Sequence, residues 1–226
     1  MMNRSLALSL LALIVGAGSA SSQYRGLREV RGDAGMFGFN LAVGAPQGDF
    51  AQNVNVAGGV DAFATVNMGA GNPLGLRFEG AYLVYGSDQQ FDLNTTYAIA
   101  TLGFGPQITV GEGPMRLYGF GTVGFSYISA YSSFPDGCGC YSSGSQTDFS
   151  DWTSALQAGG GMLLTLGRGR TPVSLDIGAR YLYSGFANYV APGDVQPQPN
   201  GDIVVFTSRA RPNLAEVHFG VSIGIR

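Results

Sequence analysis

The chain has 226 residues, a formal net charge of −3 and a pI near 5.0; 12% of its residues are charged and 45% are hydrophobic. All 12 basic residues are arginine, and 36 residues are glycine. This composition excludes a disordered chain, which needs low hydrophobicity and high charge, and a nucleic-acid-binding protein, which needs a basic face. It also excludes a long coiled coil, because glycine disfavours helices. What remains is a glycine- and aromatic-rich β protein of one domain.

The first segment has the pattern of a secretory signal peptide. Arg4 supplies a positive charge, an apolar stretch follows at 6–15, and Gly18-Ser19-Ala20 places small residues before the expected cleavage site. The apolar stretch is too short for a transmembrane anchor, and the chain beyond it has no run of roughly 20 apolar residues. No cysteine lies near the cleavage site, so a lipid-modified N-terminus is not expected. We expect a signal peptide at 1–20, a short N-terminal arm at 21–33 and one domain at 34–226.

The rest of the chain alternates apolar and polar residues with a period of two, which predicts β-strands. In one segment, for example, Val173, Leu175 and Ile177 fall on one face, and Asp176 and Arg180 fall on the other. The facing of one expected strand, 115–128, is ambiguous. Eight strands are expected, at 35–44, 56–68, 74–85, 95–110, 115–128, 152–166, 173–183 and 214–226.

Short and long connections alternate between these strands. The short ones, rich in glycine and proline as tight turns are, lie at 69–73, 111–114 and 167–171. The long ones lie at 45–55, 86–94, 129–151 and 184–213. Eight antiparallel strands with all long loops at one end give this order, which is typical of transmembrane barrels. The apolar run at 203–206 leaves a ten-stranded barrel as the alternative.

Alternation alone does not say which face is wet, so a soluble lipocalin-like barrel is the competing fold. The less apolar face holds few charges, separated by small residues, which suits the crowded interior of a narrow barrel. Aromatic residues gather near strand ends, as they do in the girdles of transmembrane barrels. They are Tyr82, Tyr85, Tyr97, Tyr118, Tyr127, Trp152, Tyr181 and Tyr183. We therefore expect an all-β fold, an eight-stranded antiparallel up-and-down transmembrane β-barrel.

Three segments resemble the small outer-membrane β-barrel domain family, which has OmpA-, OmpX- and OmpW-type members. The segment at 41–50, with Pro46-Gln47-Gly48-Asp49-Phe50, looks like the end of the first strand and the first loop of that family. The segments at 73–79 and 173–181 look like its third and penultimate strands. The resemblance covers essentially the whole mature chain. No OmpA-type peptidoglycan-binding domain is expected, because the chain stops with the final strand.

The resemblance implies a place in the outer membrane of a Gram-negative-type bacterium. It further implies contact with outer-membrane lipid and lipopolysaccharide, and insertion by the barrel-assembly machinery with periplasmic chaperones. It implies a monomer without a cofactor.

One feature departs from the family, whose members often end in an aromatic residue that the assembly machinery recognises. This chain ends in Arg226, and its terminal apolar residues, such as Ile225 and Ile223, are shifted by one position.

Ionisable residues of four expected strands share the less apolar face, which we place inside the barrel. Charges in a low-dielectric interior must be paired, and long side chains can meet across a narrow barrel. Two roles are open for these residues: a gate that opens or plugs a pore, and a purely structural polar core, which we favour. Substituting Arg77 by Ala is then expected to lower stability without creating conductance. The seven residues are Asp61, Arg77, Glu79, Asp176, Arg180, Glu216 and His218.

His218 is the only histidine, and no soft or imidazole ligand lies near it, so no metal site is expected. Outer-membrane lipid-A deacylases, which are enzymes on similar barrels, use a histidine with a nearby serine and glutamate. Glu216, His218 and Ser222 share one strand face. Same-face neighbours are roughly 7 Å apart, so Ser222 lies about twice that from His218, too far for a hydrogen bond. A lipid-A-modifying enzyme is therefore the remote alternative.

Two cysteines, Cys138 and Cys140, lie in the long connection at 129–151. Export implies an oxidising compartment, so the pair can close a small disulfide or bridge to other molecules.

Taken together, the sequence predicts a non-enzymatic outer-membrane protein. We expect its long loops to serve surface interaction or envelope integrity, without nucleic acid as a partner. The alternative is a narrow pore or an OmpW-like pathway for small hydrophobic solutes.

Overall fold

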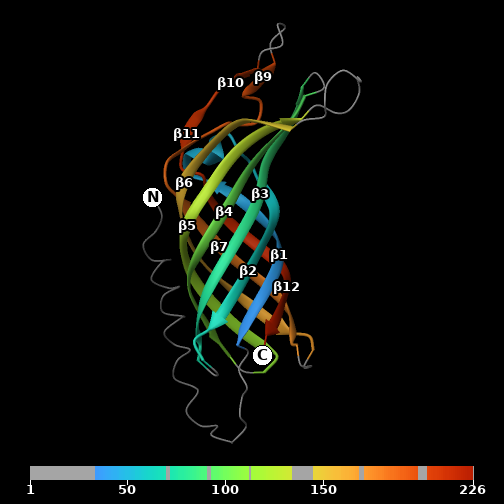
Figure 1. Ribbon diagram of the computed structural model, residues 1–226, viewed down its shortest axis with the longest axis vertical. Coiled ribbons are helices and arrows are strands. Elements are labelled where there is room, and N and C mark those ends of the chain that lie inside the picture. Colours follow the sequence, from blue (N-terminus) through green and yellow to red (C-terminus); the bar gives the residue numbers. More distant parts are fainter. Residues whose placement is uncertain are drawn as a thin grey trace, which may run out of the picture. The chain divides into compact units, whose positions relative to one another are not determined.

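Eight long strands form the wall of a barrel in the computed structural model (Figure 1). The structure describes residues 34–69, 72–90, 93–111, 113–133, 145–167, 171–197 and 203–225. The expected signal peptide and arm, and Cys138 and Cys140, lie outside the described residues. The wall strands are β1 (Gly35–Gln47), β2 (Ala57–Asn67), β3 (Leu74–Gln90), β4 (Leu93–Val110), β5 (Met115–Ser133), β6 (Ser145–Thr165), β7 (Val173–Ser184) and β12 (Asn213–Ile225).

Each wall strand pairs antiparallel with its neighbours along the chain, and β12 closes the barrel onto β1, with Phe39 opposite Val221. Closure leaves no wall strand with an open edge, which is the condition for crossing lipid with β-strands. The expected fold class, an eight-stranded up-and-down barrel, is confirmed. In the described part of the chain, no helix is long and apolar enough to cross a membrane.

The ten-stranded alternative is wrong. The apolar run that suggested it forms β10 (Ile203–Val205), which pairs with β9 (Val195–Pro197) in a separate two-stranded sheet. A second small sheet joins β8 (Ala187–Tyr189) to β11 (Ser208–Ala210). These strands are three residues long and lie in the connection between β7 and β12, so they add local hydrogen bonds without entering the wall.

Two hairpins continue well beyond the expected strand ends. The connection expected at 86–94 is mostly strand, because β3 runs to Gln90 and β4 begins at Leu93. Most of the described part of the connection expected at 129–151 is strand in the same way. A register shift marks both extensions, between Val84 and Gly86 and between Ala130 and Tyr131. Bulges of this kind occur at barrel rims. The extensions are polar and lack apolar alternation, so the period-two pattern did not find them.

The outward side chains of the wall form a broad apolar belt. Phe219 is 53% exposed and Leu41 is 63% exposed, although both are large and apolar. A contiguous apolar surface of this extent is the lipid-facing band of a transmembrane barrel rather than the exterior of a soluble one. Other exposed members of the belt are Phe37, Phe39, Phe78, Leu102, Phe104, Val123, Phe125, Leu156, Val217 and Val221.

The aromatic residues expected in the girdles divide into two groups. Trp152, Tyr82, Tyr181 and Tyr183 are exposed on the outside, as expected, and Tyr127 packs against Trp152 with ring centres 4.6 Å apart. For three tyrosines the expectation is wrong, because they are buried. They are Tyr85, Tyr97 and Tyr118. Strand parity explains the error: Tyr85 follows Glu79 by six residues, and an even spacing keeps both side chains on the same face.

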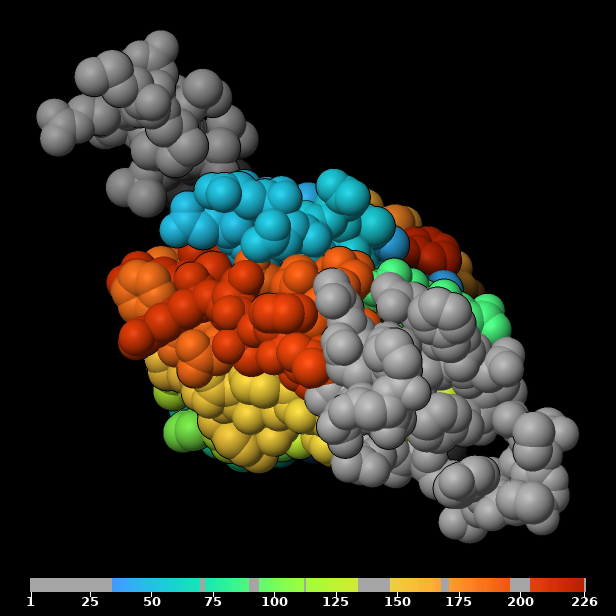
Figure 2. Space-filling model, turned by 90° about the horizontal axis from the view of Figure 1, so that it is seen from above, coloured from blue at the N-terminus to red at the C-terminus, as the bar shows by residue number. Residues whose placement is uncertain are grey.

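The barrel interior is filled in layers. At the end with the short turns lies an apolar and aromatic cluster of Met36, Phe63, Tyr118, Phe120 and Leu163. At the end with the long connections, a larger apolar cluster includes Phe50, Tyr85, Tyr97 and Tyr189. Seen from above, segments near residues 50–60 and 185–210 lie side by side over this end of the barrel (Figure 2). Several polar side chains are packed among the aromatic rings of the first cluster, and the second cluster covers them on the side of the long connections.

Candidate functional site

The first polar group of the interior centres on Arg77 of β3, which is fully buried. Its Nε donates to Oε2 of Glu79 at 2.7 Å, and its Nη1 donates to Oε1 of Gln107 at 3.0 Å. The guanidinium carbon lies 3.9 Å from the ring centre of Phe63 and 4.1 Å from that of Phe120. Two aromatic faces thus enclose the cation, which adds cation–π attraction to the ion pair. Thr122 donates to the other oxygen of Glu79 at 2.6 Å.

The second polar group centres on Arg180 of β7. Its Nε and Nη2 donate to Oε2 of Glu216 at 2.9 and 2.7 Å, and Glu216 lies directly opposite Arg180 in the β7–β12 register. Arg180 Nη2 also lies 3.7 Å from Asp61 Oδ2 on β2, although two wall strands separate β7 from β2. Asn40 donates to Oδ1 of Asp61 at 2.9 Å. This group therefore connects the barrel wall across its interior.

The third polar group is a hydrogen-bonded chain of His218, Tyr118 and Asp176. The Tyr118 hydroxyl donates to Asp176 Oδ1 at 2.8 Å and lies 2.8 Å from His218 Nε2. A hydroxyl has one proton to donate. Because that proton goes to Asp176, His218 Nε2 must carry the proton of the second bond. Tyr118 reaches over β6 at Gly161, where an added Cβ would lie 2.6 Å from the Tyr118 oxygen.

The structure brings all seven of the expected interior residues into these three groups. Sequence reasoning missed four of their partners, Asn40, Gln107, Tyr118 and Thr122. Alternation places Gln107 on the inward face of its strand, but it leaves Tyr118 undecided, because the facing of the strand at 115–128 is ambiguous. It does not say which side chains they meet. Arg77 Nη2, Arg180 Nη1 and Asp176 Oδ2 have no hydrogen-bond partner among the described residues, which leaves the network polar but incompletely satisfied.

The arrangement of His218 and Ser222 does not form a nucleophile–base pair. His218 Nε2 bonds to Tyr118, while His218 Nδ1 and Ser222 Oγ each have no hydrogen-bond partner among the described residues. Both residues are buried in the barrel interior rather than on the lipid-facing wall. Nucleophilic catalysis needs the base within hydrogen-bond reach of the nucleophile. The interior network is therefore arranged for charge pairing.

An apolar plug covers the network on the side of the long connections. Phe50, in the short 3-10 helix η2 (Gly48–Gln52), is fully buried, with its ring centre 5.0 Å from that of Tyr189 and 5.5 Å from that of Tyr85. The Tyr85 hydroxyl donates to the carbonyl of Val190 at 3.0 Å, and Asn53 donates to the Tyr189 hydroxyl at 2.8 Å. No sequence pattern indicated this plug, because its residues come from irregular connections.

Comparison with known proteins gives a likeness of fold. No protein-family profile and no curated protein sequence matches the chain. Ail, the attachment invasion locus protein of Yersinia pestis, is 14% identical with a TM-score of 0.46, over 85% of this chain and 98% of that one. Neisserial surface protein A is 12% identical with a TM-score of 0.47, over 85% and 97%. A major outer membrane protein from Thermus thermophilus is 15% identical with a TM-score of 0.47, over 84% and 98%.

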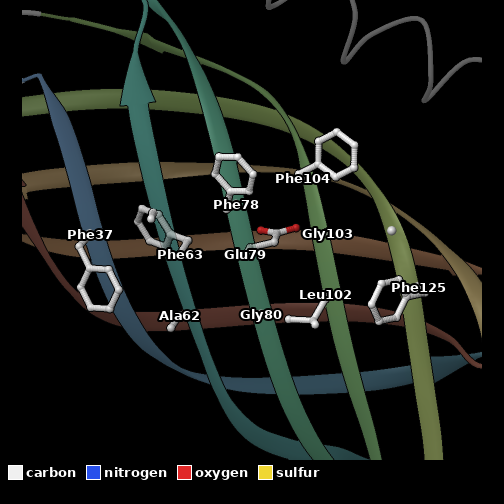
Figure 3. Close-up of a pocket in the computed structure, with 12 residues that line it drawn as sticks. Phe37, Ala62, Phe63, Phe78, Glu79, Gly80, Leu102, Gly103, Phe104 and Phe125 are labelled. Carbon is white, nitrogen blue, oxygen red and sulfur yellow. The ribbon is translucent and has the colours of Figure 1, made fainter.

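The outer wall also carries a hollow of about 460 Å³, on the face of β1 to β5. Five phenylalanines line it, the exposed Phe37, Phe78, Phe104 and Phe125 and the buried Phe63 (Figure 3). Ala62, Ala64 and Gly80 form part of its lining, and their small size leaves the space between the rings. Phe78 and Phe104 stack with ring centres 6.4 Å apart. Because this surface lies in the apolar belt, the hollow faces hydrocarbon rather than water.

Proposed function

We propose that this protein is a non-enzymatic barrel of a bacterial outer membrane, with a sealed interior, that anchors an array of long loops on the outer surface. The observation that carries this proposal is the filling of the interior along its length. Paired charges packed among aromatic rings fill the part of the interior toward the short turns, and an apolar plug fills the part toward the long connections. Phe50 closes the last layer and is 0% exposed.

The outer-membrane location is supported by two features. The expected export signal at 1–20 would deliver the chain across the inner membrane. A closed barrel with an apolar belt is the architecture of bacterial outer-membrane proteins. We propose that periplasmic chaperones and the barrel-assembly machinery bring the chain to its place, where lipid and lipopolysaccharide surround it. We further propose that it acts as a monomer.

The surface role is supported by the two hairpins that continue past the barrel rim and by the two small sheets between β7 and β12. Regular hydrogen bonding in these segments holds a defined surface on the loop side. We propose that this surface meets a partner outside the cell or contributes to envelope integrity. The pairing of Cys138 and Cys140 stays a prediction.

The test is single-channel recording of the folded mature protein in a planar bilayer, with an open porin as the positive control. We expect no discrete conductance steps, because packed polar, aromatic and apolar side chains fill the interior. Insertion must be shown independently, by β-sheet circular dichroism and by the altered gel mobility of the unheated barrel. Conductance steps that change on substitution of Arg77 or Glu79 would overturn the sealed interior and favour a narrow solute pathway.

A further inference from the structure

Two arginines gather around an exposed aromatic ring at the loop end of β7. Arg209 lies in β11, and Arg211 lies just before β12. The guanidinium carbon of Arg211 is 4.4 Å from the ring centre of Phe186 and 5.3 Å from that of Tyr183, whose hydroxyl it also contacts. The guanidinium carbon of Arg209 is 5.8 Å from the Phe186 ring. We call Arg209, Arg211, Phe186 and Tyr183 the arginine patch.

The arginine patch lies at the level of the membrane–water interface. Tyr183 and Tyr181 are outward residues of β7, and Trp152 is an outward residue of β6; all three are exposed. Tyrosine and tryptophan at strand ends mark the level of lipid headgroups. Because Arg211 stacks on Tyr183, its guanidinium group lies at this level on the side of the long connections.

A groove of about 580 Å³ lies below the patch on the lipid-facing wall. Tyr181, which borders the groove, lies two residues from Tyr183 and opposite Ala215 of β12. The groove therefore begins where the patch ends and extends into the apolar belt. The lining includes the exposed polar residue Asn55, and its other outward apolar residues are Val43, Ala45, Val56, Ala158, Ala179 and Val217.

The local charge favours an anion. Arg209 has one carboxylate near it, Asp151, whose oxygens accept hydrogen bonds from the backbone of Trp152 and from Asn188. The bonds from Asn188, and then that from Trp152, hold the pKa of Asp151 below its usual value, so this acid stays charged. The patch thus holds two arginines, and Asp151 interacts with Arg209 of the pair.

The other charged side chains described on the loop side are aspartates, namely Asp49, Asp88, Asp148 and Asp194. Within the described ranges, the positive charge of this side is therefore concentrated in the arginine patch. Guanidinium groups present paired donors that match phosphate oxygens. Both guanidinium carbons lie within 5.8 Å of the Phe186 ring centre, so a phosphate beside this ring would be near their donors, and an apolar chain attached to it could extend toward the groove.

We propose that Arg209 and Arg211 bind the phosphate of an anionic lipid of the loop-side leaflet, with one acyl chain of that lipid in the groove between β6, β7, β12 and β1. This inference rests on the proposed function, because the leaflet supplies the lipid. It adds a defined site and a preference for anionic headgroups to the general contact of a barrel with its membrane.

The experiment is native mass spectrometry of the folded mature protein in neutral detergent, titrated with phosphatidylglycerol or with phosphatidylcholine. We expect wild type to retain phosphatidylglycerol about tenfold or more tightly than phosphatidylcholine. The double variant Arg209→Gln/Arg211→Gln should lose this preference. Arg116→Gln removes an arginine at the short-turn end and should keep the preference. An unchanged preference in the double variant would overturn the proposal.

Two further arms identify the source of the phosphate and the role of the groove. Excess inorganic phosphate should not displace the lipid, since it cannot occupy the groove; full displacement would instead assign the patch to free anions. Ala179→Leu places a larger side chain in the groove and should weaken phosphatidylglycerol binding. Unchanged binding would show that the acyl chain does not lie in the groove. Arg209→Gln alone is the reserve variant if the double variant fails to fold, because Arg209 is exposed; it should weaken the preference, and an unchanged preference would count against the site.

The two proposals fail in different ways. If the protein inserts and shows no conductance but has no preference for the anionic lipid, the proposed function stands and the lipid site is contradicted. A protein that does not insert, or that conducts, contradicts the proposed function whatever the lipid titration shows.

Discussion

Arg77 is held by contacts that replace its hydration almost entirely. Phe63 and Phe120 cover the two faces of its guanidinium group, and Glu79 and Gln107 accept hydrogen bonds from its edge. A charge buried in this way is costly unless it is paired. Removing one side chain of the Arg77–Glu79 pair therefore lowers the free energy of unfolding by more than the pair itself contributes, because the other charge stays buried without a partner.

This reasoning predicts an asymmetric result at Arg77. Arg77→Met should lower the free energy of unfolding by about 3–5 kcal/mol, because it leaves Glu79 buried with its charge unpaired. The double variant Arg77→Met/Glu79→Gln should recover a large part of that loss. The measurement is urea unfolding in lipid vesicles, read by tryptophan fluorescence. Equal losses in the single and double variants would show that the two side chains are not coupled.

At the scale of the element, β4 and β5 approach each other closely where two glycines face one another. Gly103 lies opposite Gly124 in their register. A Cβ added at Gly124 would overlap the carbonyl oxygen of Leu102, a backbone atom that has no rotamer to change. At Gly121 of the same strand the nearest atom to an added Cβ lies 3.8 Å away, which is an ordinary contact. Comparing alanine substitutions at these two glycines therefore distinguishes the effect of close strand approach on stability from the effect of β-propensity.

We expect Gly124→Ala to destabilise the barrel by about 1–3 kcal/mol, the usual cost of forcing atoms into a packed site. Gly121→Ala is the matched control and should stay within about 0.5 kcal/mol of wild type. Both are measured as free energies of unfolding, with hydrogen exchange of the β4 amides as a local reading. A Gly124→Ala barrel as stable as the control would mean that β4 and β5 can separate without loss.

The connections behave as elements of the interior as well as of the surface. η2 places Phe50 against Tyr85 of the wall and Tyr189 of β8, so two irregular segments and one strand share a single cluster. Edge-to-face aromatic contacts of this kind add to the burial of the rings. The plug is therefore built by the same apolar packing that builds a soluble core.

At the scale of the whole molecule, the barrel is the inverse of a soluble protein, with a polar layer inside and an apolar belt outside. Phe219 lies near the middle of the outward face of β12, and Ile225 lies at its end. In a soluble barrel an exposed arginine at either position would be nearly neutral. In lipid its cost depends on depth.

Phe219→Arg should therefore lower the free energy of unfolding in lipid vesicles by about 2–4 kcal/mol, and Ile225→Arg by about 0–1 kcal/mol. The comparison uses the same strand and the same new residue, so only depth in the membrane differs. Equal effects at the two positions would contradict the placement of the belt in hydrocarbon.

The sequence by itself determined the fold class, the eight wall strands and the face on which each charged residue lies. It did so because side chains alternate strictly along a strand and because the order of short and long connections admits one arrangement of strands. Alternation groups Arg77, Arg180 and His218 on the less apolar strand faces, and the few charges and small residues of those faces indicate that they point into a narrow barrel. Tyr85 was expected in an aromatic girdle, although it shares the strand face of Glu79, and the structure shows that it is buried inside.

Only the tertiary structure decided which interior side chains meet. The contact of Arg180 with Asp61, and the chain from His218 through Tyr118 to Asp176, join strands that are not neighbours in the wall. Such contacts depend on the register and curvature of the closed barrel, which set the height of each residue in the interior. The plug and the arginine patch also combine residues from separate connections. Connections have no periodic sequence pattern, so the sequence does not predict which of their residues come into contact.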